Sequence, residues 1–276
     1  MIGTAVGKMI KMTKNTFQVI DGKSLKLNDK IVSISTKDPS VTEDIVMKAF
    51  KAQKVSSWFQ NFDTTKAALA HVEVRDVFFF RGDTLGFLIM NCEVYDLKDF
   101  EEKTKNPDAK VPRLPGYVFI RGDAVSVLFI LIEEKTKTKY VILTEQFRTP
   151  AGRPMIECPA GMMDEERNFT GVAAKEIEEE VGIKVKGEDL QELITIAPSP
   201  GGCDENVKIF YYEKEVSEEK MRELEKHLGG LRDHGELIAL KILKLDPKSM
   251  LENLEVFDAK LASALFAYFT KFSAKL

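Results

Sequence analysis

The sequence lacks an apolar run approaching the roughly 20 residues that a membrane-spanning helix needs. Its densest apolar stretch, AVSVLFILI at residues 124–132, has the length of a strand and is followed by charged residues. It also lacks a long block of like charge, and its formal net charge is −4, which excludes a broadly basic surface for nucleic acid. We therefore expect no membrane insertion and no nucleic-acid partner, so an anionic ligand has to be met by local groups.

Cysteine is scarce as well, and the three that occur, Cys92, Cys158 and Cys203, are odd in number and widely spaced. This pattern favours unpaired thiols that serve in packing, in a reducing compartment. Internal repeats and low-complexity segments are absent from the sequence. The 276 residues, 44% hydrophobic and 30% charged, are typical of a globular protein with one large domain or two unequal ones.

Both ends of the chain carry patterns related to cellular location. Residues 1–20 contain three lysines and no acidic residue, but they lack the arginines typical of a transit peptide. The last three residues, Ala274, Lys275 and Leu276, have the small-basic-leucine pattern of a peroxisomal import signal. We predict a peroxisome-type organelle, with the cytoplasm as the alternative.

The first part of the chain mixes strand and helix patterns. Strands are predicted at residues 30–37 and 73–82, and one helix is predicted at residues 42–62 with Thr42 as its N-cap. Residues 99–116 are polar and punctuated by proline, so they are the best candidate for a domain boundary.

Beyond that boundary, predicted strands are interleaved with helices, including one at residues 217–227 and a closing helix at about 249–272. Such an order indicates a sheet layered with helices. We therefore predict a β-rich N-terminal region at residues 1–112 and an α/β domain at residues 113–276.

Residues 157–185, ECPAGMMDEERNFTGVAAKEIEEEVGIKV, contain a cluster of glutamates. On a helix, Glu176, Glu179 and Glu180 lie within one arc because positions i, i+3 and i+4 share a face. Clustered carboxylates repel one another unless solvent or a cation compensates, and Mg²⁺ prefers oxygen ligands. The stretch therefore indicates a magnesium site or a solvated acidic face. An apolar stripe borders the three carboxylates, formed by Ala173, Ala174, Ile177 and Val181.

The same residues resemble the Nudix box of the Nudix hydrolases, G-x5-E-x7-R-E-U-x-E-E-x-G-U, in which U is a bulky aliphatic residue. Matching positions are Gly161, Glu176, Ile177, Glu179, Glu180, Gly182 and Ile183. Two positions depart, because Arg167 stands at the first Glu and Lys175 at the Arg. In the family those two positions form an ion pair that braces the loop. Here Lys175 has other candidate partners, namely Asp164, Glu165 and Glu166.

Further segments are similar to the nucleotide-sugar branch of that family, especially to plant-type ADP-sugar diphosphatases: RGDAVSVLFIL, LTEQFRTPAGRPMIECPAGM, APSPGGCDENV and LRDHGELIAL. The resemblance covers about residues 113–245. It implies a Nudix α/β/α sandwich preceded by a small β-rich N-terminal domain, which in the family commonly helps to build a homodimer.

The resemblance also implies roles for individual residues. The expected ligands of Mg²⁺, or of Mn²⁺ as the alternative ion, are the carboxylates of Glu176, Glu179 and Glu180 and the carbonyl of Ala160. Glu179 and a glutamate on a late loop, Glu236, are the expected catalytic carboxylates. The alternative for Glu236 is a surface charge at a strand edge.

Substrate contacts are expected from two places. Arg148 ends a predicted strand, where its guanidinium can hold phosphate oxygens or form a structural ion pair. The turn-rich SPGGCDE segment is expected to contact substrate through Gly201, Gly202, Asp204 and Glu205.

The implied reaction is magnesium-dependent hydrolysis of a nucleoside diphosphate sugar to a nucleoside monophosphate and a sugar 1-phosphate. ADP-glucose and ADP-ribose are the first expected substrates and UDP-glucose the second. The alternative is a non-catalytic Nudix-fold protein that binds a nucleotide or a partner, motivated by Arg167 and Lys175. Cleavage of coenzyme A or of a dinucleotide ranks below both.

Overall fold

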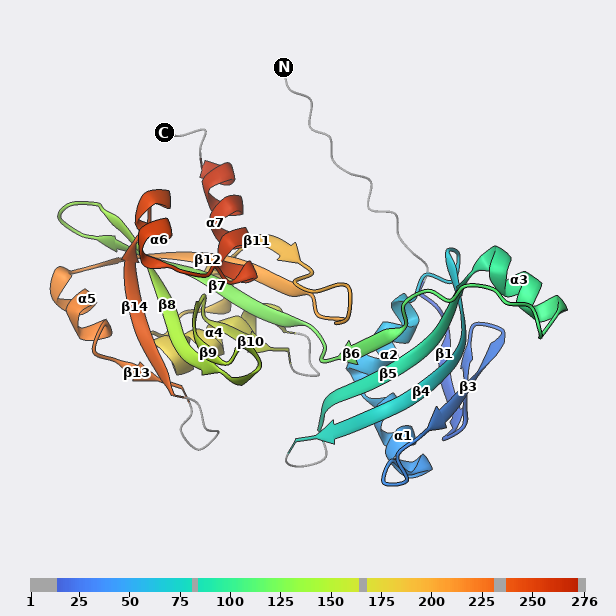
Figure 1. The fold of residues 1–276 in the computed structure, drawn as a ribbon. Helices are drawn as coiled ribbons and strands as arrows, with labels where there is room; N and C mark the ends of the chain where they lie inside the picture. The colour runs from blue at the N-terminus through green and yellow to red at the C-terminus, as the bar shows by residue number, and fades with distance from the viewer. Residues whose placement is uncertain (1–13, 81–83, 164–167, 231–236, 273–276) are drawn as a thin grey trace, which may run out of the picture. The chain divides into compact units, whose positions relative to one another are not determined.

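The structure, a computed structural model, describes residues 14–80, 84–163, 168–230 and 237–272 (Figure 1). Three sets of residues that the sequence analysis singled out lie outside the described residues. They are the predicted base Glu236, Arg167 (which departs from the Nudix box) with residues 164–166, and the terminal pattern at 274–276. The chain divides into two compact units. The first contains the described residues of Met1–Arg121 and Gly201–Asp204, and the second those of Gly122–Pro200 and Glu205–Leu276.

In its described residues, the first unit is a six-stranded sheet in the order β1-β2-β3-β4-β5-β6. Neighbouring strands are antiparallel except β3 and β4, which run parallel because a helical crossover joins them. The strands are β1 (Phe17–Asp21), β2 (Ser24–Leu27), β3 (Lys30–Thr36), β4 (Ala67–Phe79), β5 (Leu85–Asp96) and β6 (Tyr117–Ile120).

The predicted helix at residues 42–62 is wrong in one respect, because it is two helices, α1 (Glu43–Lys51) and α2 (Gln53–Asn61). Thr42 caps α1 as predicted, since its side chain accepts a hydrogen bond from the backbone N–H of Ile45. The chain breaks at Ala52, whose ψ of 139° is extended rather than helical. The break lets both apolar faces reach the same core, where Phe50 and Phe59 are fully buried.

The predicted boundary segment at residues 99–116 contains a helix and leads to a further strand of the first unit. Helix α3 (Leu97–Lys105) is capped by Asp96, and β6 then pairs with β5. The change of unit therefore follows Arg121 rather than residue 112. Polar composition alone does not separate an exposed helix from a linker, and α3 has no buried residue.

The second unit contains an eight-stranded sheet in its described residues, with the path β11-β12-β7-β8-β14-β13; β10 pairs with β7 and β9 with β8. Strand β7 is buried along nearly its whole length, as expected of a central strand covered on both faces. The strands are β7 (Ala124–Glu133), β8 (Lys139–Arg148), β9 (Arg153–Glu157), β10 (Ala160–Met162), β11 (Gln191–Ile196), β12 (Val207–Val216), β13 (Leu228–Gly229) and β14 (Ile238–Lys244).

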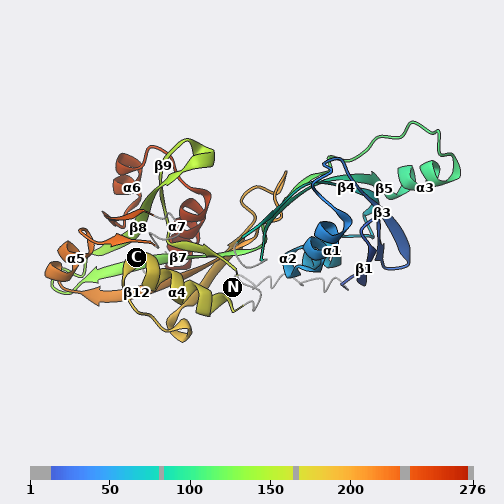
Figure 2. The same cartoon turned by 90° about the horizontal axis from the view of Figure 1, so that it is seen from below.

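Helices cover both faces of this sheet, which confirms the predicted α/β/α sandwich (Figure 2). Alternate residues of β7 pack in opposite directions, Leu128 toward the core shared with α7 and Phe129 toward the core shared with α4. The predicted closing helix is also divided in two. The helices are α4 (Phe169–Val181), α5 (Glu218–Leu224), α6 (Pro247–Asn253) and α7 (Ala259–Phe272).

Two smaller expectations concern cysteine and the membrane. Cys92 and Cys158 are buried as packing residues, whereas Cys203 is only partly buried, and no disulfide joins the three. Within the residues that the structure describes, no helix has the length and apolarity needed to cross a membrane.

Candidate functional site

Helix α4 carries the glutamate cluster and is fixed at both ends. The side chain of Asn168 accepts a hydrogen bond of 3.0 Å from the N–H of Gly171, and Gly182 ends the helix in the left-handed conformation, with a φ of 72°. Ala173, Ile177 and Val181 are buried against the sheet, as the spacing predicts. The rotation of the helix, and with it the direction of the carboxylates, is therefore set by packing.

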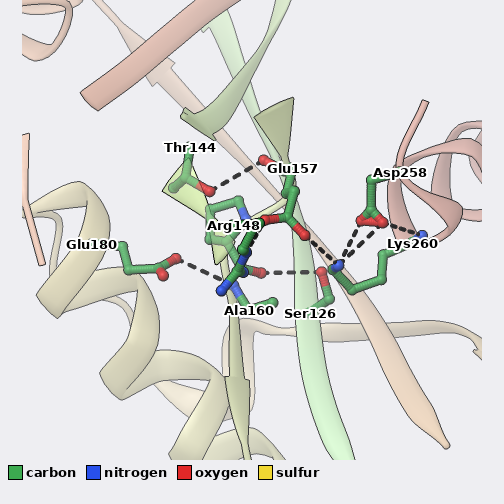
Figure 3. Close-up of polar contacts among 9 residues, drawn as sticks. Ser126, Thr144, Arg148, Glu157, Ala160, Glu180, Asp258 and Lys260 are labelled. Carbon is green, nitrogen blue, oxygen red and sulfur yellow. Dashed lines mark hydrogen bonds and ion pairs between the residues drawn. The ribbon is translucent and has the colours of Figure 1, made fainter. Parts of the chain in front are cut away.

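Two of the carboxylates, those of Glu176 and Glu180, lie one turn apart and meet the same short strand, β10. Figure 3 shows Glu180 beside Ala160. The N–H of Ala160 donates to Oε2 of Glu180 over 3.2 Å, and Glu180 is only 5% exposed. A Cβ added at Gly161 would lie 1.8 Å from Oε1 of Glu176. A side chain at this position would displace the Glu176 carboxylate, which occupies the space of a Cβ.

Glu179 lies on the same helix but has a different environment. Its Oε1 is 3.3 Å from Nζ of Lys175, and its side chain is 25% exposed. Lys175, which replaces the arginine of the box, therefore pairs with Glu179 among the described residues. The other candidate partners of Lys175, residues 164–166, lie outside the described residues.

The C-terminal end of α4 packs on residues 228–230, the last described residues before Glu236 in the sequence. The N–H of Gly230 donates to the carbonyl of Glu179 over 3.1 Å. A Cβ at Gly229 would lie 2.0 Å from the carbonyl oxygen of Glu180, so Gly229 allows close packing of β13 on the helix. Gly230, the last described residue before 231–236, is therefore fixed to the glutamate helix.

The residues of this site fit a hard divalent cation in the chemistry of their donors. Glu176 and Glu180 supply carboxylate oxygens at one strand, and Mg²⁺ commonly takes one or two protein carboxylates and keeps several waters. Across the described ranges, no group of three or more His, Cys, Asp or Glu side chains is gathered closely enough to hold a metal. The candidate site therefore consists of two carboxylates, with Glu179 paired beside them.

Arg148 lies in a chain of charges that the sequence did not predict (Figure 3). Its Nε is 2.5 Å from Oε2 of Glu157, whose other oxygen, Oε1, is 2.8 Å from Nζ of Lys260. Lys260 in turn lies 2.5 Å from Oδ1 of Asp258. The structural ion pair, which was the alternative for Arg148, is thus formed.

The central carboxylate of this chain is ionised despite its burial. Burial acts to raise the pKa of Glu157, but the charges of Lys260 and Arg148 outweigh it and lower the pKa from its ordinary value. For Lys260, burial acts to lower the pKa, and the carboxylates of Asp258 and Glu157 reverse this effect and raise it. Glu157 is therefore an anion and Lys260 a cation at neutral pH.

The predicted substrate loop is divided between the units. Gly201, Gly202 and Asp204 belong to the first unit, where the carbonyl of Gly202 accepts from the N–H of Phe119 over 2.7 Å. Oδ1 of Asp204 accepts from the N–H of Arg121 over 2.8 Å. Glu205 belongs to the second unit. The residues of the glutamate site all belong to the second unit. Gly201, Gly202 and Asp204 are not among them.

Comparison with known sequences defines the class of protein. Residues 121–261, more than half of the 276 residues, match the family model described as "NUDIX domain". The chain therefore belongs to the Nudix family.

Individual relatives show which named proteins the chain is similar to. It is 39% identical over 204 residues to Nudix hydrolase 14, chloroplastic, of Arabidopsis thaliana, a match that covers 68% of this chain and 62% of that protein. It is 34% identical over 178 residues to an ADP-ribose pyrophosphatase of Bacillus subtilis, covering 64% and 86%. The match thus spans less than two thirds of the Arabidopsis relative.

A solved structure supports the fold. The crystal structure of an ADP compounds hydrolase aligns with a TM-score of 0.53 and 18% sequence identity, covering 76% of this chain and 96% of that one. At this identity, the likeness concerns the fold alone.

Proposed function

We propose that the protein hydrolyses the diphosphate bond of nucleoside diphosphate sugars in a magnesium-dependent reaction. The observation that carries the proposal is the placement of Glu176 and Glu180 against one strand, β10, in a chain of the Nudix family. A pair of buried or half-buried carboxylates with little room around them is a poor arrangement for solubility alone. The two carboxylates can instead bind a divalent cation, which would also neutralise the charge of a bound diphosphate.

ADP-sugars are the first substrates we propose, with ADP-glucose and ADP-ribose ahead of UDP-glucose. Relatives named ADP-ribose pyrophosphatase from Bacillus subtilis and ADP-sugar pyrophosphatase from Mus musculus support this order. The products are a nucleoside monophosphate and a sugar phosphate.

Each part of the site has a task in this reaction. Mg²⁺ would be held by Glu176 and Glu180, and when bound it neutralises phosphate charge and lowers the pKa of bound water. The N–H of Ala160 keeps the Glu180 carboxylate in one orientation. Arg148 holds phosphate oxygens through its guanidinium, and Glu236 receives a proton from the attacking water.

The variant Glu180→Gln tests this assignment because it keeps the shape of the side chain and removes its charge. We expect turnover of ADP-glucose to fall on the order of a hundredfold or more, with the fold retained. The matched control is Glu178→Gln, which changes an exposed glutamate of the same helix that pairs with Lys184 at 3.2 Å. Turnover unchanged in a folded Glu180→Gln variant would refute the role of Glu180.

One observation favours a second function, the binding of a nucleotide without turnover. Lys175 stands where the Nudix box has arginine, and its ammonium pairs with Glu179, which offsets the charge of one cluster member. If this function holds, ADP-ribose binds in calorimetry while no nucleoside monophosphate is released at any magnesium concentration.

A further inference from the structure

A buried network of charges links strands β8 and β9 to the beginning of helix α7 (Figure 3). The side chains of Glu157 and Asp258 are each 8% exposed and that of Lys260 is 17% exposed. Desolvating such groups is costly, and a buried ion pair is on average no better for stability than apolar residues of similar volume. The network therefore calls for an explanation other than stability.

Arg148 is the member of the network that reaches solvent, with a side chain 40% exposed. Glu157 engages its Nε, which fixes the plane of the guanidinium. Within the described residues, the structure records no acceptor for the two terminal nitrogens. Those two donors are spaced to meet two oxygens of a phosphate at once.

Glu157 is itself held from the other side. Lys260 binds the oxygen that Arg148 does not use, and Thr144 donates its hydroxyl to the carbonyl of Glu157 over 3.3 Å. Asp258 fixes Lys260 twice, because its carboxylate accepts from both the backbone N–H and the ammonium of Lys260. The guanidinium plane of Arg148 is thus set by residues at the start of α7.

The same stretch of chain also seats the glutamate site. Three residues after Glu157, the N–H of Ala160 donates to Glu180, and Gly161 lies against Glu176. The anchor of the guanidinium and the seat of the carboxylates are therefore parts of one short segment. A shift of this segment would displace both at once.

We propose that Lys260 is a positioning residue for diphosphate binding. By clamping Glu157, Lys260 holds the guanidinium of Arg148 in the orientation that receives the phosphates, and Asp258 supports Lys260. The inference rests on the proposed function, because it assumes that Arg148 contacts the diphosphate.

The test compares KM and kcat for ADP-glucose in Lys260→Met and Lys260→Arg. Loss of the clamp is expected to raise KM roughly tenfold with a smaller change in kcat, since misplacing a binding group by a fraction of an ångström has effects of this size. Lys260→Arg, which restores a cation, is expected to recover most of the loss.

Lys139→Met is the matched control. Lys139 lies on β8, at the end of the strand opposite to Arg148. It pairs with Glu213 at 2.7 Å and has Tyr268 of α7 as a second partner. The variant removes a similar link to α7 and is expected to leave KM unchanged. An equal rise in KM in both variants would overturn the inference, because it would indicate a general loss of stability.

A double-mutant cycle with Arg148→Met separates positioning from stability. If Lys260 acts through Arg148, Lys260→Met adds no further rise in KM in the Arg148→Met background. Additive effects would overturn the inference. If Lys260→Met does not fold, Lys260→Gln, which loses only the charge and some length, is measured in the same cycle.

Failure of the proposed function has a different signature. Wild-type protein without magnesium-dependent turnover contradicts the proposed function itself. Wild-type turnover with a normal KM in Lys260→Met contradicts the inference alone. A normal KM in Arg148→Met contradicts the phosphate-binding role of Arg148, and the inference with it, but leaves the magnesium-dependent hydrolysis standing.

Discussion

At the scale of single residues, Gly161 is the position that lies directly against an expected ligand carboxylate. Its backbone has no left-handed φ, so the constraint comes from the Glu176 carboxylate, 1.8 Å from the position of a Cβ. We expect Gly161→Ala to displace that carboxylate and to lower turnover by about tenfold or more.

Gly201→Ala is the control for magnesium dependence rather than for substrate binding, since Gly201 is not part of the glutamate site and a Cβ there would meet nothing within 4 Å. Magnesium titrations of turnover measure both variants. The role of Glu176 would be contradicted if Gly161→Ala kept both the rate and the magnesium dependence of the wild type.

A second residue-scale prediction concerns acid stability and Glu73. The guanidinium of Arg75 lowers the pKa of Glu73 from 4.5 to about 2, burial opposes this shift, and Lys37 adds to it. Because the folded pKa lies below the unfolded one, the pair stabilises the fold above pH 4.5 and loses this contribution as the pH falls through about 2.

Urea unfolding at several pH values between 5 and 2 tests this prediction. The free energy of unfolding is expected to fall less with decreasing pH in Glu73→Gln than in the wild type. Lys37→Met, which removes an exposed partner (72%), is expected to have the smaller effect. Identical pH dependence of wild type and Glu73→Gln would contradict the ion pair.

The sequence predicts those site residues whose relation is local. Glu176 and Glu180 share a face because helical periodicity is set within one turn. Glu157 and Lys260 are 103 positions apart, and only the folded sheet brings them together. The only signal in the sequence is a glutamate, Glu157, shortly before the PAG segment at residues 159–161. Because its partner Lys260 is distant in the sequence, Glu157 cannot be distinguished there from a surface charge.

At the scale of elements, the ends of α4 determine how firmly the glutamates are held. Gly182 has a φ of 72°, and alanine in the left-handed conformation costs about 1 kcal/mol. A Cβ at Gly182 would also lie 3.0 Å from the ring of His227. We therefore expect Gly182→Ala to lower the free energy of unfolding by at least this amount.

Gly152→Ala is the matched control for strain, because Gly152 has a φ of 68° and a Cβ there would meet nothing within 4 Å. Urea denaturation should show a comparable loss from strain for Gly152→Ala and a larger total loss for Gly182→Ala. A Gly182→Ala variant as stable as the wild type would contradict the described C-cap.

Elements with strong local signals are predicted well and interruptions are not. The apolar run at residues 124–132 predicts the central strand β7, and Gly182 predicts the end of α4. The break at Ala52 carries no glycine or proline signal. It arises because two amphipathic faces have to reach one core, which is a tertiary requirement.

At the scale of the whole molecule, we propose a homodimer, because the resemblance of residues 113–245 to the family implies an N-terminal domain that commonly helps to build one. The first unit exposes large apolar side chains that support the proposal: Phe78 (53%), Phe80 (42%), Ile89 (36%) and Tyr117 (64%). Sedimentation equilibrium is expected to give twice the chain mass of 31.1 kDa, and Phe78→Ser is expected to weaken association. A monomer at all concentrations would contradict the proposal.

The most direct test of the central claim is magnesium-dependent hydrolysis by the wild-type protein, with products identified by mass. The substrates are ADP-glucose, ADP-ribose, UDP-glucose, NADH and coenzyme A, each with and without Mg²⁺. The account predicts release of AMP and a sugar phosphate from the ADP-sugars only when Mg²⁺ is present. Binding of ADP-ribose with no product from any substrate would contradict it.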